Sequence, residues 1–162
     1  MIFREIHPEE TEQAIVIEQI CFPPHEACSP KSMRERIAAA PELFLVAEDE
    51  TTGQLAGFLN GLSTDEKVFR DEFFTDTSLF RPEGTVVMLL GLDVLPEYRR
   101  RGLATELVRR YGELAERMGK ETLILTCLEE KVPMYQKMGF TDNGISNSSW
   151  GGEQWHEMEM KL

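Results

Sequence analysis

The sequence predicts a single α/β (α+β) domain, in which a central mixed β-sheet of about seven strands is flanked by about four helices. Its 162 residues match the length of one domain of roughly 150 residues. The expected elements follow the order β-α-α-β-β-β-α-β-α-β-β, which is typical of a sheet covered by helices. One strand, residues 86–95, is apolar on both faces apart from Asp93, so it belongs in the middle of the sheet.

The N-terminal part is expected to form one strand and two helices. Residues 2–6 alternate in polarity, which predicts an opening strand. Residues 8–21 predict an amphipathic helix, because acidic residues occupy its first turn and apolar residues recur at helical spacing. The proline pair at residues 23–24 ends this helix. Ser29 is typical of an N-cap and is followed by a proline, which predicts a second helix to about Ala40.

A hairpin and a long connection come next. Residues 43–47 and 54–62 predict two strands, joined by a turn at residues 52–53. Residues 65–81 are acidic and aromatic, and we expect a long connection there with one helical turn or more. Inside the central strand that follows, Gly91 indicates a bulge or a close approach of a ligand to the backbone.

The C-terminal part is expected to contain two helices, a buried strand and a closing hairpin. Helical spacing of apolar residues predicts a helix from about residue 102 to residue 118. Residues 122–127 predict a buried strand, and residues 132–138 a short helix. The closing hairpin is expected to pair residues 145–150 with residues 155–162 around a Gly-Gly turn.

Composition excludes several classes of protein. The 17 basic and 29 acidic residues give a net charge of −12, opposite in sign to that of a nucleic-acid-binding protein. The start of the chain shows no hydrophobic leader, and the longest apolar run is too short to cross a bilayer. Three cysteines make an odd count, which favours a reducing compartment. We therefore expect a cytoplasmic protein with no nucleic-acid and no membrane partner.

A metal site is not expected, although three potential ligands lie close together in the sequence. Cys21, His25 and Cys28 have short spacings. Structural zinc usually takes four ligands, and no fourth ligand is evident nearby. An ordinary loop with incidental thiols is the interpretation we prefer.

The segment from residue 99 to residue 110 is strongly basic, with five arginines and one glutamate. Its Arg99-Arg100-Arg101 run precedes the N-terminus of a helix, where the helix dipole favours anions over cations. A bound anion would resolve this conflict by using free backbone N–H groups and arginine charge together. Gly102 removes the Cβ atom that would block a close approach, and Ala104 is also small. A solvated basic turn is the alternative.

Three stretches of the sequence carry a family resemblance. LDVLPEYRRRGLATELV resembles the coenzyme A pyrophosphate loop of the GCN5-related N-acetyltransferases (GNAT), whose pattern is Arg/Gln-x-x-Gly-x-Gly/Ala after a strand. LTCLEEKVPMYQKMGF is similar to the strand-helix-strand segment that closes the fold of this family. IEQICFPPHEACSPKSMRERI looks like the first two helices and substrate loop of the arylalkylamine, or serotonin-type, group. The resemblance implies a GNAT-like fold and a single N-acetyltransferase domain over residues 1–162.

The resemblance also implies a cofactor and an activity, namely the transfer of an acetyl group from acetyl-CoA to a small-molecule amine. Backbone groups of Leu92 and Val94 would contact the pantetheine arm, and the amides of residues 100–105 would surround the pyrophosphate. A backbone N–H near Val94 would stabilise the oxyanion. Tyr135 would lie beside the sulfur and protonate the departing thiolate. The cofactor-binding residues implied in this way are Leu92, Asp93, Val94, Arg99, Arg100, Arg101, Gly102, Leu103, Ala104, Thr105 and Tyr135.

One departure from the group leaves the general base unassigned. The serotonin-type enzymes carry two histidines on the central strand, and the matching residues here are Met88 and Leu90, which cannot accept a proton. His25 and Glu26 are substitutes by location only, and strand alternation should direct Asp93 away from the Met88 face.

The acceptor and the assembly are left open at this stage. The acidic charge would attract a cationic arylalkylamine or polyamine, and an amino group on a peptide or antibiotic is the next alternative. An apolar pocket for the acceptor could be lined by Phe22, Phe69, Phe73, Phe74 and Trp150, although core packing explains most of these residues. A CoA-binding regulator or sensor without turnover is the alternative function, and a homodimer is one assembly left open.

Overall fold

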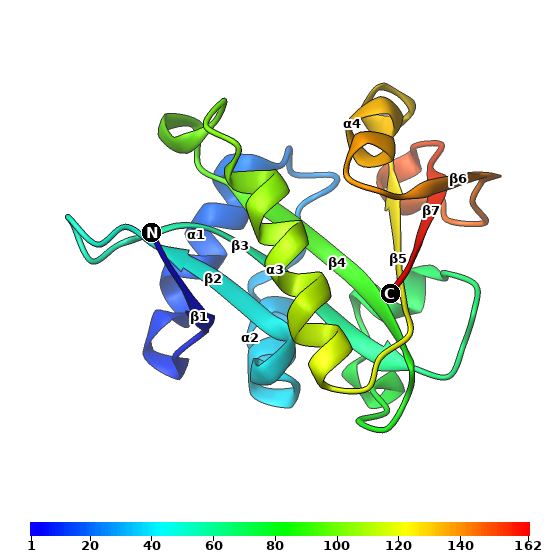
Figure 1. Ribbon diagram of the computed structural model, residues 1–162, viewed down its shortest axis with the longest axis horizontal. Coiled ribbons are helices and arrows are strands. Elements are labelled where there is room, and N and C mark those ends of the chain that lie inside the picture. The colour runs from blue at the N-terminus through cyan, green and yellow to red at the C-terminus, as the bar shows by residue number, and fades with distance from the viewer.

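The computed structural model describes all residues from 1 to 162, and it confirms the predicted fold class (Figure 1). Seven strands form one sheet in the order β1-β2-β3-β4-β5-β7-β6. Only the β4–β5 pair is parallel, so the sheet is mixed. The strands are β1 Ile2–Glu5, β2 Phe44–Glu48, β3 Leu55–Thr64, β4 Val86–Val94, β5 Thr122–Cys127, β6 Thr141–Ile145 and β7 His156–Lys161. The helices are α1 Thr11–Cys21, α2 Pro30–Ala39, α3 Leu103–Arg117 and α4 Val132–Lys137.

The helices cover both faces of the sheet. Helix α3 crosses one face, whereas α1 and α2 lie on the other (Figure 1). The apolar stripe of α3, which includes Leu107 and Tyr111, is buried in the larger of two hydrophobic clusters. The smaller cluster holds Ile17 of α1 and Ile37 of α2. Strand β4 therefore has an apolar layer on each side, as its sequence predicts. No helix has the length and apolar character needed to cross a membrane.

Strands β4 and β5 pair only at their beginnings. The parallel register runs from Val86 opposite Thr122 to Met88 opposite Ile124 and then stops. On the other edge of β4, Asn60 of β3 pairs with Gly91 and Gly61 pairs with Leu89, so Leu90 is left over as a bulge. This confirms the bulge predicted at Gly91. Beyond it, the C-terminal halves of β4 and β5 have no register to each other, and β4 presents an open edge.

The closing hairpin corrects one predicted boundary. Strand β6 is Thr141–Ile145, whereas the sequence pattern placed a strand at residues 145–150. Residues after 145 leave the strand because Trp150 is held elsewhere: its ring lies 4.6 Å from that of Phe74, and its Nε1 donates to the Glu26 carbonyl at 2.8 Å. The Gly-Gly turn belongs to a 3-10 turn at Trp150–Gly152.

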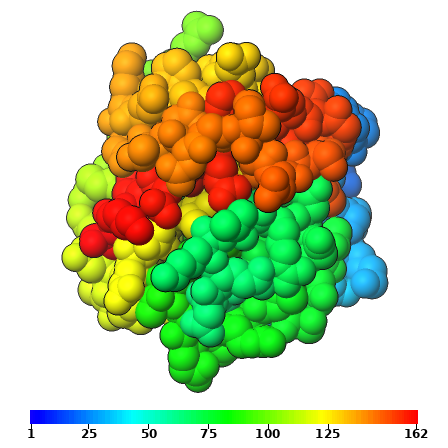
Figure 2. Space-filling model, turned by 90° about the vertical axis from the view of Figure 1, so that its right-hand side faces the viewer, coloured from blue at the N-terminus to red at the C-terminus, as the bar shows by residue number.

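The connection between β3 and β4 contains two 3-10 turns, Asp71–Phe74 and Thr77–Leu79, as expected for residues 65–81. It lies directly against the C-terminal segment (Figure 2). Glu157 of β7 accepts a hydrogen bond from the Phe69 N–H at 3.2 Å, and Ser148 bonds to Asp71. These contacts hold Phe74 and Trp150 together at one end of the molecule.

Candidate functional site

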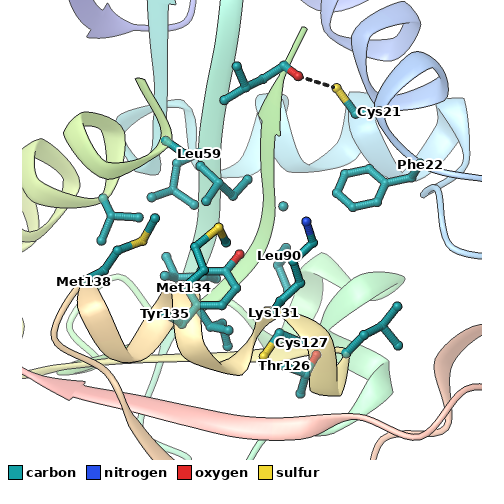
Figure 3. Close-up of a pocket in the computed structure, with 18 of the residues that line it drawn as sticks. Cys21, Phe22, Leu59, Leu90, Thr126, Cys127, Lys131, Met134, Tyr135 and Met138 are labelled. Carbon is teal, nitrogen blue, oxygen red and sulfur yellow. Dashed lines mark hydrogen bonds between the residues drawn. The ribbon is translucent and has the colours of Figure 1, made fainter. Parts of the chain in front are cut away.

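A cavity of about 580 Å³ opens where β4 and β5 diverge (Figure 3). Its walls come from α1, β4, the turn before α3, β5 and α4, with two tryptophans closing one side. Most of the lining is apolar, and the polar exceptions include Glu18, Glu26, Arg99, Arg100 and Lys131. A largely apolar cavity with a few convergent polar groups is typical of a small-molecule site.

The open edge of β4 faces this cavity with backbone groups. The Leu95 N–H donates to the Ala56 carbonyl next to β3 at 2.9 Å. Because the backbone groups of successive strand residues point to opposite edges, those of Val94 and Leu92 face the β5 side. The Val94 carbonyl there accepts from Arg99 Nε at 2.9 Å. It also accepts from Cys21 Sγ at 3.4 Å (Figure 3). The Leu92 groups and the Val94 N–H remain for a ligand that extends along the strand.

The turn between β4 and α3 forms a cradle of backbone N–H groups. Arg100 has φ 62° and Gly102 has φ 76°, and such left-handed residues direct neighbouring N–H groups into a concave surface. Gly102 is the N-cap of α3 and has no side chain to cap it, and the first intrahelical bond runs from the Glu106 N–H to the Gly102 carbonyl at 3.0 Å. The amides of residues 103–105 are therefore free for an anion.

Tyr135 lies on the opposite wall and is positioned by α4. Its ring meets that of Phe140 edge-on, with 5.6 Å between the centroids, and its hydroxyl faces the cavity (Figure 3). Burial raises the pKa of Tyr135 above its ordinary value, and Cys127 and Asp93 add to this rise. The phenol therefore stays protonated throughout the physiological range. Burial likewise raises the pKa of the adjacent Cys127 thiol to about 12.

A second group of polar residues gathers at the loop after α1. His25 Nε2 lies 3.2 Å from Glu26 Oε2 and 3.4 Å from Glu153 Oε1. Burial raises the pKa of Glu26, whereas the charge of His25 lowers it. The three cysteines are free. The Cys21 thiol donates to the Val94 carbonyl. The potential metal ligands that lie within 4.8 Å of one another are His25, Glu26 and Glu153. They are not the set Cys21, His25 and Cys28 that lies close together in the sequence.

The structure brings most of the residues singled out by the sequence to one cavity. Of the eleven residues that the resemblance implies, Leu92, Val94, Arg99, Arg100, Gly102, Leu103, Ala104, Thr105 and Tyr135 line it. Asp93 is buried behind β4, and Arg101 lies outside, over the ring of Tyr98 at 5.7 Å. Leu90 lines the cavity, whereas Met88 is buried in the larger hydrophobic cluster.

Two charged lining residues were not singled out from the sequence, namely Glu18 and Lys131. A signal existed for Glu18, because it lies on the apolar stripe of α1 between Ala14 and Cys21. A carboxylate on a buried helix face is rare unless it is paired. For Lys131 the sequence carries no comparable signal, since it comes from a surface turn. Of the aromatic residues expected to line a pocket, Phe22, Phe74 and Trp150 do so, whereas Phe69 and Phe73 are buried in the core.

Comparisons with known proteins agree with this geometry. The model of the acetyltransferase (GNAT) family matches residues 6–140. Serotonin N-acetyltransferase from Mesocricetus auratus is 27% identical over 164 residues, covering 99% of this chain and 77% of that protein. Aminoglycoside N(6')-acetyltransferase type 1 from Acinetobacter baumannii is 31% identical over 124 residues, covering 75% of this chain and 77% of that protein. The GphF GNAT-like decarboxylase in complex with isobutyryl-CoA has a similar fold, with a TM-score of 0.85, 17% identity and 99% of each chain covered.

Proposed function

The chain belongs to the acetyltransferase (GNAT) family, and we propose that it transfers the acetyl group of acetyl-CoA to a primary amine by direct attack on the thioester. One observation carries this proposal. A single cavity joins an anion-binding turn, an open strand edge and a protonated phenol. These are the groups needed to hold a pyrophosphate, an extended arm and a leaving thiolate.

The binding of acetyl-CoA follows from the groups along the cavity. The free amides of residues 103–105, with Arg99 and Arg100 beside them, would hold the pyrophosphate. The backbone of Leu92 would pair with the amide groups of the pantetheine arm, much as an added strand would. The fit is supported by the bound isobutyryl-CoA of the similar GphF structure, because that ligand shares the CoA portion.

Tyr135 would supply the proton for the leaving thiolate. In water a phenol is a weaker acid than a thiol, so this transfer would be uphill. The cavity destabilises both anions, because burial raises the pKa of Tyr135 and raises that of the Cys127 thiol to about 12. A CoA thiolate formed beside Cys127 would be destabilised in the same way, so the Tyr135 hydroxyl would hydrogen-bond to the sulfur as the C–S bond breaks and would pass it the proton, with solvent restoring the phenol. The Val94 N–H would stabilise the oxyanion.

The acceptor is proposed to be an arylalkylamine or a polyamine. The carboxylates of Glu18 and Glu26 lie on the cavity wall and attract a cation. The rings of Phe22, Phe74 and Trp150 line the same region and provide an apolar surface for an aromatic group. A non-catalytic CoA sensor is the alternative function, favoured by Met88 and Leu90 in place of proton-accepting residues, whereas Tyr135 favours an enzyme.

An amine panel decides between the two functions. We expect thiol release from acetyl-CoA with tryptamine, phenethylamine or spermidine, together with an acetylated product seen by mass spectrometry. The matched control is tryptophol, which keeps the ring and replaces the amine with a hydroxyl group. Tight binding of CoA without thiol release for any amine, including an aminoglycoside, would identify the protein as a sensor.

A further inference from the structure

Two carboxylates are buried together behind the cavity wall. Glu18 of α1 is 4% exposed and Asp93 of β4 is 0% exposed. Glu18 Oε2 accepts a hydrogen bond from the Cys28 N–H at 3.0 Å. Glu18 Oε1 and both oxygens of Asp93 have no partner. Buried polar atoms are nearly always hydrogen-bonded, so three unpartnered carboxylate oxygens at one place call for a functional explanation.

The unpartnered oxygens converge at Gly91, the glycine beside the β4 bulge. A Cβ atom added to Gly91 would lie 3.1 Å from Asp93 Oδ1 and 3.5 Å from Glu18 Oε1. Gly91 and Glu18 both line the cavity. Glu18 Oε1 is buried, and the absence of a side chain at Gly91 leaves room beside it at this point of the wall. The pair is therefore adjacent to the place where the acceptor amine and the thioester would meet.

The surroundings support one negative charge on this pair. Arg36 of α2 is 2% exposed and is the buried cation nearby: its Nη1 approaches Asn60 Oδ1 at 3.5 Å, and Asn60 Nδ2 donates to the Gly91 carbonyl at 3.3 Å. Two close carboxylates in an apolar site do not both ionise. Burial, followed by the charge of the neighbouring Glu18 carboxylate, raises the pKa of Asp93 well above its usual range. The other titratable or charged groups that act on the pair or lie around it are Cys21 of α1, Cys28 of the following loop, Arg99 of the turn and Tyr135 of α4.

We propose that Glu18 and Asp93 share one proton, and that Glu18 is the general base that removes a proton from the acceptor amine. Asp93 is the positioning residue, whose O–H holds the Glu18 carboxylate toward Gly91. This inference rests on the proposed function. It fills the role left open by Met88 and Leu90, which cannot accept a proton. The charge-assisted O–H···O⁻ bond is among the strongest hydrogen bonds available to a side chain.

At neutral pH the amine is an ammonium ion, which first gives one proton to the Glu18 carboxylate, directly or through one water molecule. The neutral nitrogen then forms the C–N bond with the acetyl carbon and releases a second proton to solvent through the cavity. The C–S bond breaks, and the Tyr135 hydroxyl gives its proton to the sulfur. The pair has gained one proton and Tyr135 has lost one, and exchange with solvent through the cavity restores both.

Glu18→Gln tests the base. At pH 7 we expect kcat/KM to fall about 10²- to 10³-fold, a typical contribution of general base catalysis. Without the base, only the neutral amine reacts, so the rate of the variant should rise about tenfold per pH unit up to the pKa of an alkylamine, about 10.4. The wild-type rate should level off at a much lower pH. Acetyl-CoA affinity, measured by calorimetry, should be unchanged in the variant.

Asp93→Asn tests the positioning role. An amide still donates to Glu18, but more weakly than a carboxyl O–H, so ionised Glu18 loses stabilisation. We expect the acidic limb of the pH profile to move to higher pH, while the plateau rate stays within about tenfold of wild type. The matched control is Glu12→Gln, the same change on the exposed side of α1, where Glu12 forms only an exposed ion pair with Arg34. It should leave the whole profile unchanged.

The outcomes separate this inference from the proposed function. Thiol release by the wild-type protein tests the function alone. If wild type is active and Glu18→Gln keeps its rate and profile, or if Glu26→Gln is the variant that removes the plateau, the pair is not the base. Infrared spectroscopy reads the shared proton without any activity: wild type should show a protonated carboxyl band at neutral pH that disappears in Asp93→Asn. A wild-type spectrum with no such band overturns the shared proton.

Discussion

Replacing Gly102 with valine should weaken the binding of coenzyme A by about 10²-fold or more, as measured by calorimetric titration. Two effects act in the same direction. A branched side chain at the N-cap would stand where the pyrophosphate meets the free amides of residues 103–105. The φ of 76° also disfavours any residue with a Cβ, so the cradle itself would shift. Losing two hydrogen bonds to a charged group, at about 1.5 kcal/mol or more each, accounts for this factor.

Gly53→Val is the matched control for Gly102→Val. Gly53 has φ 74° and lies in the turn between β2 and β3, and a Cβ atom there, as at Gly102, meets nothing within 4 Å. Both variants should lose about 1–2 kcal/mol of stability from the same backbone strain, which thermal unfolding would show. Only Gly102→Val should lose affinity for coenzyme A. If the two variants bind coenzyme A equally well, the turn before α3 is not the pyrophosphate site.

Local patterns predicted the parts of the fold that depend on local physics. An apolar run such as β4 must lie in the middle of the sheet, and the helical spacing of apolar residues in α3 requires one buried face. Both predictions were confirmed. The error at β6 has a different origin. Residues 141–145 contain Asp, Asn and Gly, which are depleted in strands. They form a strand because β7 pairs with them. The strand ends at residue 145 because Trp150 packs against Phe74 and donates a hydrogen bond to the Glu26 carbonyl.

The candidate site also has one part that a local pattern predicts and one part that depends on tertiary packing. The turn at residues 99–105 is continuous in the chain, so its arginines and glycine carried a readable signal. Glu18 and Asp93 lie on α1 and β4 and meet only because α1 packs across the sheet beside the bulge. Strand alternation placed Asp93 on the face opposite to Met88, and this prediction was wrong. The bulge at Leu90 shifts the alternation, because Asp93 pairs with Phe58 and Met88 with Leu62, so the two side chains share a face. No local pattern shows that Glu18 lies beside Asp93 on that face. Such pairs follow from packing, and no local pattern specifies them.

Tyr135→Phe should lower kcat by about 10²- to 10⁴-fold, the usual contribution of general acid catalysis. Acetyl-CoA affinity should change little, because the ring keeps its edge-on contact with Phe140. The loss should persist from pH 7 to about pH 10, where phenols ordinarily begin to ionise. The reason is that burial raises the pKa of both Tyr135 and its neighbour Cys127, so a thiolate formed there needs a proton across that range. Steady-state kinetics over this pH range provide the measurement.

Tyr111→Phe is the control that separates chemistry from packing. The Tyr111 hydroxyl is buried under α3 and donates to the Leu43 carbonyl at 2.8 Å, and neither residue lines the cavity. Removing it should cost about 1 kcal/mol of stability and leave kcat unchanged. Tyr135→Phe should lower kcat and leave stability unchanged, because no hydrogen bond within the protein holds the Tyr135 hydroxyl. If Tyr135→Phe instead keeps the wild-type kcat, Tyr135 is a packing residue, and the departing thiolate takes its proton from another source.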